Sequence, residues 1–231
     1  MNPKIAIITG ATGELGPHVV QYFLEKGIRV IAIGKSHEKS VELQKTCNQP
    51  ELLTTLEADL TDPNAVQQAF DRIKAEFKTV HILVHIAGGF KGGKPLSESD
   101  DKVWDQMMDI NLKSAYLCTR AVLPLMQQQN YGRILTIGAM AGLHPKANRT
   151  AYGVSKAGLM FLTRSIAAEG KPYNIHANSI APGIIDTPAN RAAMPDMDHS
   201  GWVLPERIAK TLWYLCTDSA ENITGCILEM P

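Results

Sequence analysis

The sequence lacks the features that would assign it to a membrane, to nucleic acid or to secretion. Its 23 basic and 23 acidic residues cancel, so no net positive charge attracts nucleic acid or an anionic membrane surface. No apolar run approaches the roughly 20 residues of a membrane helix. The apolar run at residues 1–10 lacks the long core and the small-residue cleavage site of a signal peptide. We therefore expect a cytoplasmic protein with no nucleic-acid or membrane partner.

Disulfide and metal-binding patterns are also missing. The four cysteines are scattered and form no CxxC pair. This pattern favours reduced cysteines, mostly buried in the core of a cytosolic protein. His81 and His85 lie four residues apart on an expected buried strand, with no cysteine or carboxylate partner at ligand spacing. We expect no metal site.

What the chain has instead is an alternation of short apolar strands and helical segments. The expected strands are 4–8, 28–33, 52–57, 80–86, 133–137, 174–180 and 226–230. The expected helices are 14–26, 64–77, 102–129, 151–170 and 205–217, with Pro124 kinking or splitting the third. This alternation predicts a single α/β domain over residues 1–231, a Rossmann-type doubly wound parallel sheet of about seven strands with helices on both faces. The only long irregular segment, residues 181–204, is predicted to be a substrate loop.

A glycine-rich loop follows the first expected strand. Glycines at 10, 13 and 16 permit a tight turn and a close backbone approach to a pyrophosphate, and the next helix offers free N–H groups and the positive end of its dipole. An ordinary turn is the alternative, because the GxxGxxG spacing is a weak signal by itself. The strand–loop–helix context favours a dinucleotide site. The expected contacts in this loop are Gly10, Thr12, Gly13, Glu14, Leu15 and Gly16.

The end of the second expected strand favours NADP(H) over NAD(H). An acidic residue there would bind the ribose hydroxyls of NAD, but the strand ends in Gly34-Lys35-Ser36-His37. Lys35 and Ser36 could instead meet a 2′-phosphate. Glu38 is close enough to leave NAD(H) open, and Lys35 as a solvated surface lysine is the plainer interpretation.

Tyr152 and Lys156 form a candidate catalytic pair. Four residues apart, they share one face of an expected helix. A nearby ammonium stabilises a phenolate, so we expect Lys156 to lower the pKa of Tyr152. Tyr152 could then act as a general acid toward an oxygen or nitrogen that receives a hydride.

Across nearly its whole length the sequence resembles the short-chain dehydrogenase/reductase family. The resemblance rests on Thr9–Gly16, Asp59-Leu60, Ala87-Gly88, Asn111–Ser114, Tyr152 with Lys156, and Pro182-Gly183 with Thr187. It implies an NAD(P)-dependent oxidoreductase in which Asp59 holds the adenine and Asn111 orders a water in a proton relay with Lys156. It also implies that Ile185 and Thr187 hold the nicotinamide carboxamide. The two long helices, 102–129 and 151–170, would form a dimer face in a homodimer or homotetramer.

Two stretches depart from the family pattern. Where the family has Asn-Asn-Ala-Gly, this chain has His85-Ile86-Ala87-Gly88. The family's catalytic serine lies thirteen residues before the tyrosine, and that position is Ala139 here. Losing one donor to the reacting oxygen costs a few kcal/mol of transition-state stabilisation. The alanine therefore indicates either a small carbonyl, imine or quinonoid substrate that needs no second donor, or a non-catalytic NADP-binding regulatory protein.

One branch of the family, the dihydropteridine reductases, also has alanine at this position. The glycine-rich stretch 87–93 and the stretches 186–191 and 194–196 with Trp202 resemble that branch, whereas the region around Asn111 resembles other members. Dihydropteridine reductase is therefore one alternative. Phe90 and Trp202 are candidates for stacking on a flat substrate beside Ala139, although each ring could equally be a packing aromatic.

Overall fold

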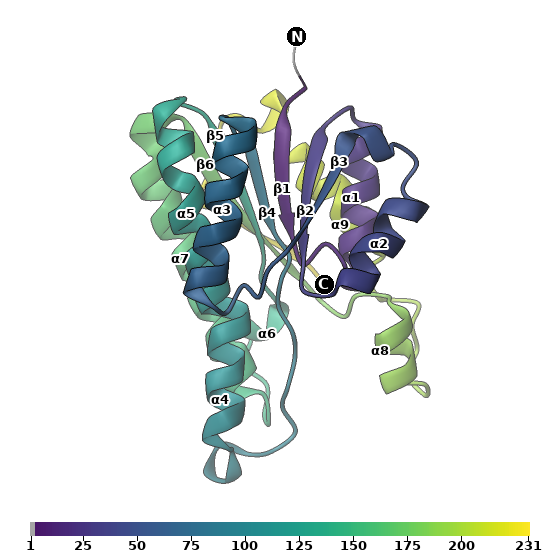
Figure 1. Ribbon diagram of the computed structural model, residues 1–231. Coiled ribbons are helices and arrows are strands. Elements are labelled where there is room, and N and C mark those ends of the chain that lie inside the picture. The colour runs from purple at the N-terminus through teal and green to yellow at the C-terminus, as the bar shows by residue number, and fades with distance from the viewer. Residues whose placement is uncertain (1–2) are drawn as a thin grey trace.

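Seven parallel strands form the centre of the structure, a computed structural model that describes residues 3–231 (Figure 1). The strands lie in the order β3-β2-β1-β4-β5-β6-β7. Their bounds are β1 Ile5–Thr9, β2 Arg29–Gly34, β3 Leu53–Glu57, β4 Ile82–His85, β5 Gly132–Ile137, β6 Ile175–Pro182 and β7 Ile227–Met230. This order reverses direction between β1 and β4, which is the point where open α/β sheets form a ligand crevice.

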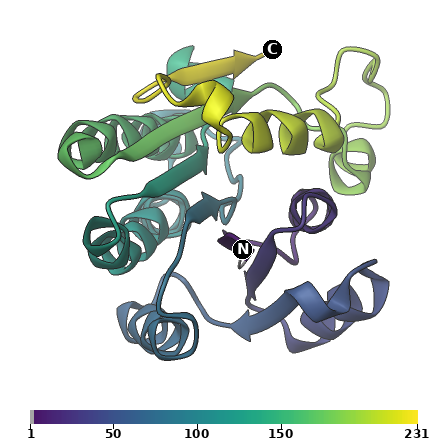
Figure 2. The ribbon, with the colours of Figure 1, turned by 90° about the horizontal axis from the view of Figure 1, so that it is seen from above.

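Helices cover both faces of the sheet (Figure 2). Their bounds are α1 Gly16–Glu25, α2 His37–Thr46, α3 Pro63–Phe77, α4 Asp101–Met108, α5 Ser114–Gln128, α6 Met140–Leu143, α7 Thr150–Gly170, α8 Pro188–Ala193 and α9 Pro205–Tyr214. Short 3₁₀ turns occur at Pro50–Leu52, Leu96–Glu98, Lys171–Tyr173 and Asp218–Ala220. None of the helices described within residues 3–231 has the length and hydropathy to cross a bilayer.

Two apolar cores separate the sheet from its helices. Ala6 and Ile8 of β1 pack in the core with α1 and α9, whereas Ile5 and Ile7 pack in the core with α3, α5 and α7. Because successive side chains of a strand point to opposite faces, a continuously apolar strand supplies both cores at once. The predicted doubly wound parallel sheet is confirmed.

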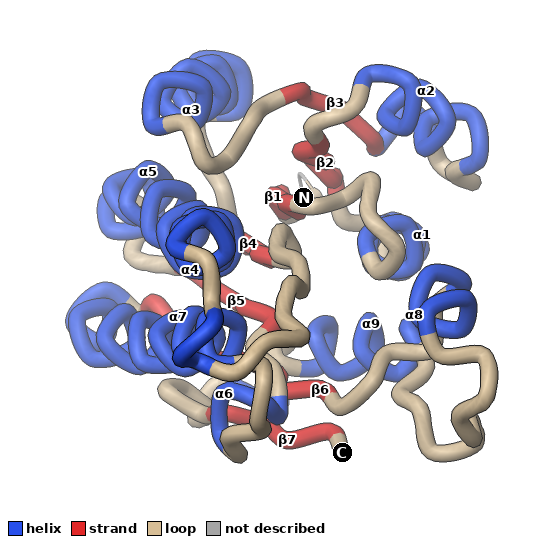
Figure 3. Tube along the Cα trace, turned by 90° about the horizontal axis from the view of Figure 1, so that it is seen from below, coloured by secondary structure: helices blue, strands red, loops and turns tan. Residues whose placement is uncertain are grey.

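The elements that leave these layers lie at the carboxyl end of the strands. Seen from that end, α4, α6 and α8 surround the tips of the central strands (Figure 3). The chain between β4 and α4 and the chain around α8 reach the same end from opposite sides of the sheet (Figure 1). A binding site at this end is therefore built from connections rather than from the sheet itself.

The structure corrects the expected elements in two places. The helix expected over 102–129 is interrupted by a π-helical turn, Asp109–Lys113, and Pro124 lies inside α5. The missing N–H of Pro124 is tolerated because the residue is solvent-exposed. The second correction concerns α2, α6 and α8, which were not expected. These helices are short or have few buried residues, so their apolar periodicity is weak.

Candidate active site

A cleft of about 1120 Å³ lies at the carboxyl end of the strands. It is larger than the roughly 300–1,000 Å³ of most ligand pockets, so it has room for an extended ligand and a second molecule. The predicted cofactor residues that line it are Gly10, Thr12, Gly13, Glu14, Leu15, Lys35, Asp59, Leu60, Ala87, Gly88, Tyr152, Lys156, Pro182, Gly183, Ile185 and Thr187. The predicted substrate residues Phe90 and Ala139 line it as well, whereas Gly16, Asn111 and Trp202 do not.

The glycine loop owes its shape to Gly10 and Gly16. Gly10 has φ +65°, and a Cβ there would lie 2.6 Å from the backbone nitrogen of Ala87, two residues after β4. A Cβ on Gly16 would collide with the carbonyl of Ala11, so Gly16 packs helix against loop instead of facing the cleft. The loop therefore brings backbone close to the cleft at Gly10 and Gly13, and begins α1 beside it.

Lys35 does not stand alone at the end of β2. Its Nζ donates to Asp59 Oδ2 at 2.6 Å, and Asp59 Oδ1 accepts from the backbone and hydroxyl of Thr61. The hydrogen bond from Lys35, followed by those from Thr61, lowers the pKa of Asp59 to about 2. β2 and β3 are paired, which puts the two side chains together, and Ser36 caps α2. Lys35, which was expected to be available to a 2′-phosphate, is therefore paired with Asp59, and its side chain is 78% exposed.

Tyr152 and Lys156 both face the cleft from α7, as expected from their spacing. Lys156 is buried, its Nζ donates to the carbonyl of Ile137 at 2.7 Å, and burial lowers its pKa to about 8. Burial raises the pKa of Tyr152, and the charge of Arg149 offsets part of this rise. The Tyr152 pKa is thus raised and not lowered as expected, because desolvation of the phenol is the larger effect.

Asn111 supports the site from behind. It lies in the π-helical turn, fully buried, where its Oδ1 accepts from Gly89 N at 2.9 Å and its Nδ2 donates to Gly89 O at 3.0 Å. The Nδ2 also donates to Ser155 Oγ, one residue before Lys156. A Cβ on Gly88 would lie 2.7 Å from Asn111 Oδ1 and 3.2 Å from Lys156 Nζ. In this structure the Asn111 amide fixes the turn after β4, and its role in a water relay stays a prediction.

The two departures from the family pattern have separate places. His85 is buried at the end of β4, where its Nδ1 lies 3.0 Å from Thr9 Oγ1 and its Nε2 lies 3.2 Å from Ser114 Oγ. It therefore ties β1 and β4 to the first residue of α5. Ala139 lies at the cleft wall before α6 and offers only a methyl group where the resemblance implies a hydroxyl.

The two aromatic candidates differ. Phe90 is 57% exposed, lines the cleft and packs edge-on against the Tyr152 ring at 5.0 Å between centroids. Trp202 is only 9% exposed and its ring lies 4.2 Å from that of His199, outside the cleft lining. Stacking of Trp202 on a substrate is therefore unsupported, because its ring is already packed within the loop.

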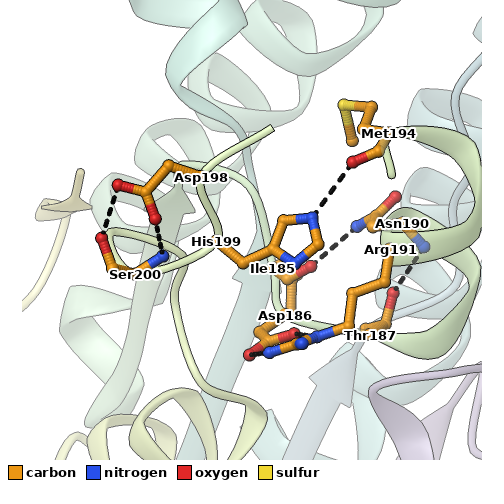
Figure 4. Close-up of polar contacts among 9 residues, drawn as sticks. All are labelled: Ile185, Asp186, Thr187, Asn190, Arg191, Met194, Asp198, His199 and Ser200. Atoms are coloured by element: carbon orange, nitrogen blue, oxygen red, sulfur yellow. Dashed lines mark hydrogen bonds and ion pairs between the residues drawn. The ribbon is translucent and has the colours of Figure 1, made fainter. Parts of the chain in front are cut away.

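The expected substrate loop contains a short ordered helix, α8, and its own polar network (Figure 4). Thr187 Oγ1 accepts from the backbone N–H of Asn190, and Asn190 Nδ2 donates to the carbonyl of Ile185 at 2.8 Å. Arg191 forms a two-point ion pair with Asp186. These contacts hold Ile185 and Thr187 at the cleft, so the segment is less irregular than expected.

Sequence reasoning missed several residues of the cleft wall. Among them are Gln106 in α4, Asp109 directly after it, and Arg149 at the start of α7. A usable signal existed only for Arg149, which lies three residues before the candidate proton donor Tyr152 at a helix start. The others come from helices whose position over the cleft no local pattern reveals.

Known proteins match the chain over most of its length. A family model described as short chain dehydrogenase matches residues 4–198. The chain is 30% identical to the 3-oxoacyl-acyl-carrier-protein reductase FabG of Salmonella typhimurium, covering 98% of this chain and 95% of that protein. It is also 30% identical to the cis-4-hydroxycyclohexanecarboxylate dehydrogenase of Sinomonas cyclohexanicum, covering 98% and 94%. The crystal structure of gox2181 superposes with a TM-score of 0.93 at 29% identity, covering 100% and 95%.

These relatives bear on the two alternatives left open by Ala139. One is named as a reductase and the other as a dehydrogenase, and neither is named as a dihydropteridine reductase. They therefore lend no support to the dihydropteridine branch. They also give no support to a non-catalytic cofactor-binding protein.

Proposed function

The chain belongs to the short chain dehydrogenase family and is an NAD(P)-dependent oxidoreductase, and from this premise we propose that it reduces a small carbonyl, imine or quinonoid substrate. The observation that carries the proposal is the placement of Tyr152 and Lys156 in the same cleft that the glycine loop lines. A proton donor and a cofactor cradle that share one cavity are what hydride transfer to a C=O or C=N bond requires.

The chemical roles follow from the surroundings of each residue. When bound, the reduced nicotinamide supplies the hydride to the substrate carbon. Tyr152 donates its hydroxyl proton to the oxygen or nitrogen left with the electron pair, and burial, which raises the pKa of this hydroxyl, favours its protonated form. Lys156, anchored by the Ile137 carbonyl, keeps a positive charge near the phenolate that forms. Asn111 positions the turn that carries Gly88 and Gly89.

The residues at the other end of the cleft fit a nicotinamide dinucleotide. The glycine loop and the start of α1 offer backbone N–H groups for a pyrophosphate. We favour NADP(H), because Lys35 and no carboxylate follows the end of β2, and the exposed Lys35 side chain could leave Asp59 for a 2′-phosphate. If Lys35 instead stays paired with Asp59, no free cation is left for a 2′-phosphate, and NAD(H) would be favoured.

A homodimer or homotetramer in the cytoplasm remains part of the proposal. Exposed apolar side chains lie on three neighbouring helices of one side of the molecule, Trp104 on α4, Tyr116 on α5, and Val154 and Phe161 on α7. Exposed apolar side chains gathered on adjacent helices are typical of a subunit interface.

The test is the Tyr152→Phe variant, assayed for NADPH and NADH oxidation with ketones, cyclic imines and quinonoid dihydropterin. The wild-type protein should turn over at least one of these substrates, and the variant should lose about 10²-fold or more of that rate, because it lacks the acid. Cofactor binding, followed by fluorescence titration, should change little.

Each outcome has a definite meaning. Turnover restricted to dihydropterin would favour the dihydropteridine reductase alternative. Cofactor binding without any turnover would favour the non-catalytic alternative. A variant as active as the wild type would remove Tyr152 from the mechanism.

A further inference from the structure

The substrate end of the cleft contains a cation that neither the family resemblance nor the reduction step accounts for. Arg149 is the residue before α7 and lines the cleft together with Phe90 and Tyr152. Its guanidinium carbon lies 5.2 Å from the centre of the Phe90 ring. The Phe90 ring in turn contacts the Tyr152 ring, so the charge lies one aromatic ring away from the proposed proton donor.

The local backbone holds Arg149 in this place. Asn148 adopts a left-handed conformation with φ 63°, which asparagine tolerates better than most residues. The carbonyl of Asn148 accepts from Gly93 N at 2.8 Å, and the Arg149 carbonyl accepts from Gly153 N at the start of α7. The turn after β4 and the start of α7 are thus joined, and the side chain of Arg149 leaves this junction on the cleft side.

Several other charged side chains of the cleft are already paired, and the ammonium of Lys156 donates to the carbonyl of Ile137. Lys35 pairs with Asp59, and Asp109 pairs with Lys113 at 3.0 Å. The loop arginine nearby, Arg191, pairs with Asp186. Within residues 3–231 no carboxylate lies within ion-pair distance of Arg149. An arginine placed between an aromatic ring and a substrate cavity without an acidic partner is available to an anionic ligand.

We infer that Arg149 binds an anionic group of the substrate, so that the protein acts on carbonyl compounds that carry a carboxylate or phosphate. This inference rests on the proposed reductase function and specifies its substrate class. The planar guanidinium offers two parallel N–H donors, which match the oxygens of a carboxylate or a phosphate. An ion pair with Arg149 would hold the substrate so that its carbonyl lies near Tyr152. This orientation would compensate for the hydrogen-bond donor that Ala139 does not provide.

The test measures binding first, so that it does not depend on turnover. Calorimetric titrations of the NADP⁺-loaded protein would compare 4-oxopentanoate with its methyl ester, and with hydroxyacetone phosphate as the second anion. Wild-type protein should bind one of the anions at least about tenfold more tightly than the ester, the size expected for a charge-assisted hydrogen bond. Arg149→Met should abolish this preference, and Arg149→Lys should restore part of it. Arg207→Met, an exposed arginine on α9, is the matched control and should keep the preference.

Steady-state kinetics then separate the alternatives. Arg149→Met should raise KM for the anionic ketone about ten- to a hundredfold and leave KM for the ester unchanged. A fall in kcat that is equal for acid and ester would instead place Arg149 on the reacting oxygen and overturn the inference. Equal binding of acid and ester by the wild type, or binding of neither anion, would overturn it too. The Tyr152→Phe variant should keep the anion preference without turnover, so a failure of the proposed reductase function is seen separately.

Discussion

At the scale of single residues, three side chains distinguish the site and its surroundings. Ala139 lacks the hydroxyl that the family resemblance implies, His85 is a buried imidazole at the end of β4, and Arg149 is a cation in the cleft wall. Among these three residues, His85 is the one whose surroundings set its protonation state. It contacts the hydroxyls of Thr9 and Ser114, and burial followed by the charge of Lys156 lowers its pKa to about 3. It is therefore a neutral structural histidine.

The neutral state of His85 predicts a loss of stability in acid. The unfolded chain takes up this proton near pH 6.5, whereas the folded protein takes it up only near pH 3. Titration of His85 therefore leaves the free energy of unfolding unchanged above pH 6.5. Below pH 6.5 it lowers this free energy by up to about 1.4 kcal/mol per pH unit. Urea unfolding between pH 7 and pH 4 should show a shallower loss for His85→Gln than for the wild type. The exposed His144→Gln control should keep the wild-type slope, and equal slopes for all three proteins would contradict the assignment.

At the scale of elements, the interruption between α4 and α5 is the feature that organises the site. The π-helical turn Asp109–Lys113 turns Asn111 inward, where its amide satisfies both backbone groups of Gly89. π-helical turns within helices are frequent at functional sites, because the extra residue re-aims one side chain. Pro124, which was expected to kink or split the helix, does not split it, since α5 continues on both sides of this residue.

We expect Asn111→Ala to loosen the turn after β4 without unfolding the domain. The variant loses two partly buried hydrogen bonds to Gly89 and a buried one to Ser155, which together correspond to about 2–3 kcal/mol of unfolding free energy. Hydrogen exchange of residues 86–93 should become faster, and turnover should fall together with it. Lys113→Ala removes only an exposed pair in the same turn and should change stability by about 0.5 kcal/mol or less. Unchanged exchange at 86–93 in Asn111→Ala would show that Asn111 does not hold the turn.

At the scale of the whole molecule, one side of the fold carries several exposed apolar side chains. Phe161 on α7 is 71% exposed, and α4, α5 and α7 lie next to one another (Figure 3). Burial of such a ring typically contributes about 1.5–3 kcal/mol, which favours association of two copies through these helices. The opposite helical layer has its own exposed aromatic, Tyr214 on α9.

Phe161→Glu should therefore shift the protein toward the monomer, because a charge in an apolar interface loses its solvation. Analytical ultracentrifugation at micromolar concentration would measure the change. Tyr214→Glu on α9 is the matched control and should leave a dimer intact. An assembly that survives Phe161→Glu but dissociates with Tyr214→Glu would place the interface on the other layer.

The sequence by itself determined the sheet, the glycine loop, the Tyr152–Lys156 pair and the absence of the family serine. These features are local: strand periodicity, a loop between strand and helix, and a four-residue spacing each arise from neighbours in the chain. Only the tertiary structure decided which charges meet. It paired Lys35 with Asp59 across two adjacent strands, packed Trp202 against His199, and left Arg149 without a carboxylate beside Phe90. It also set the direction of the Tyr152 pKa, because desolvation depends on everything that surrounds a group and not on its neighbours in sequence.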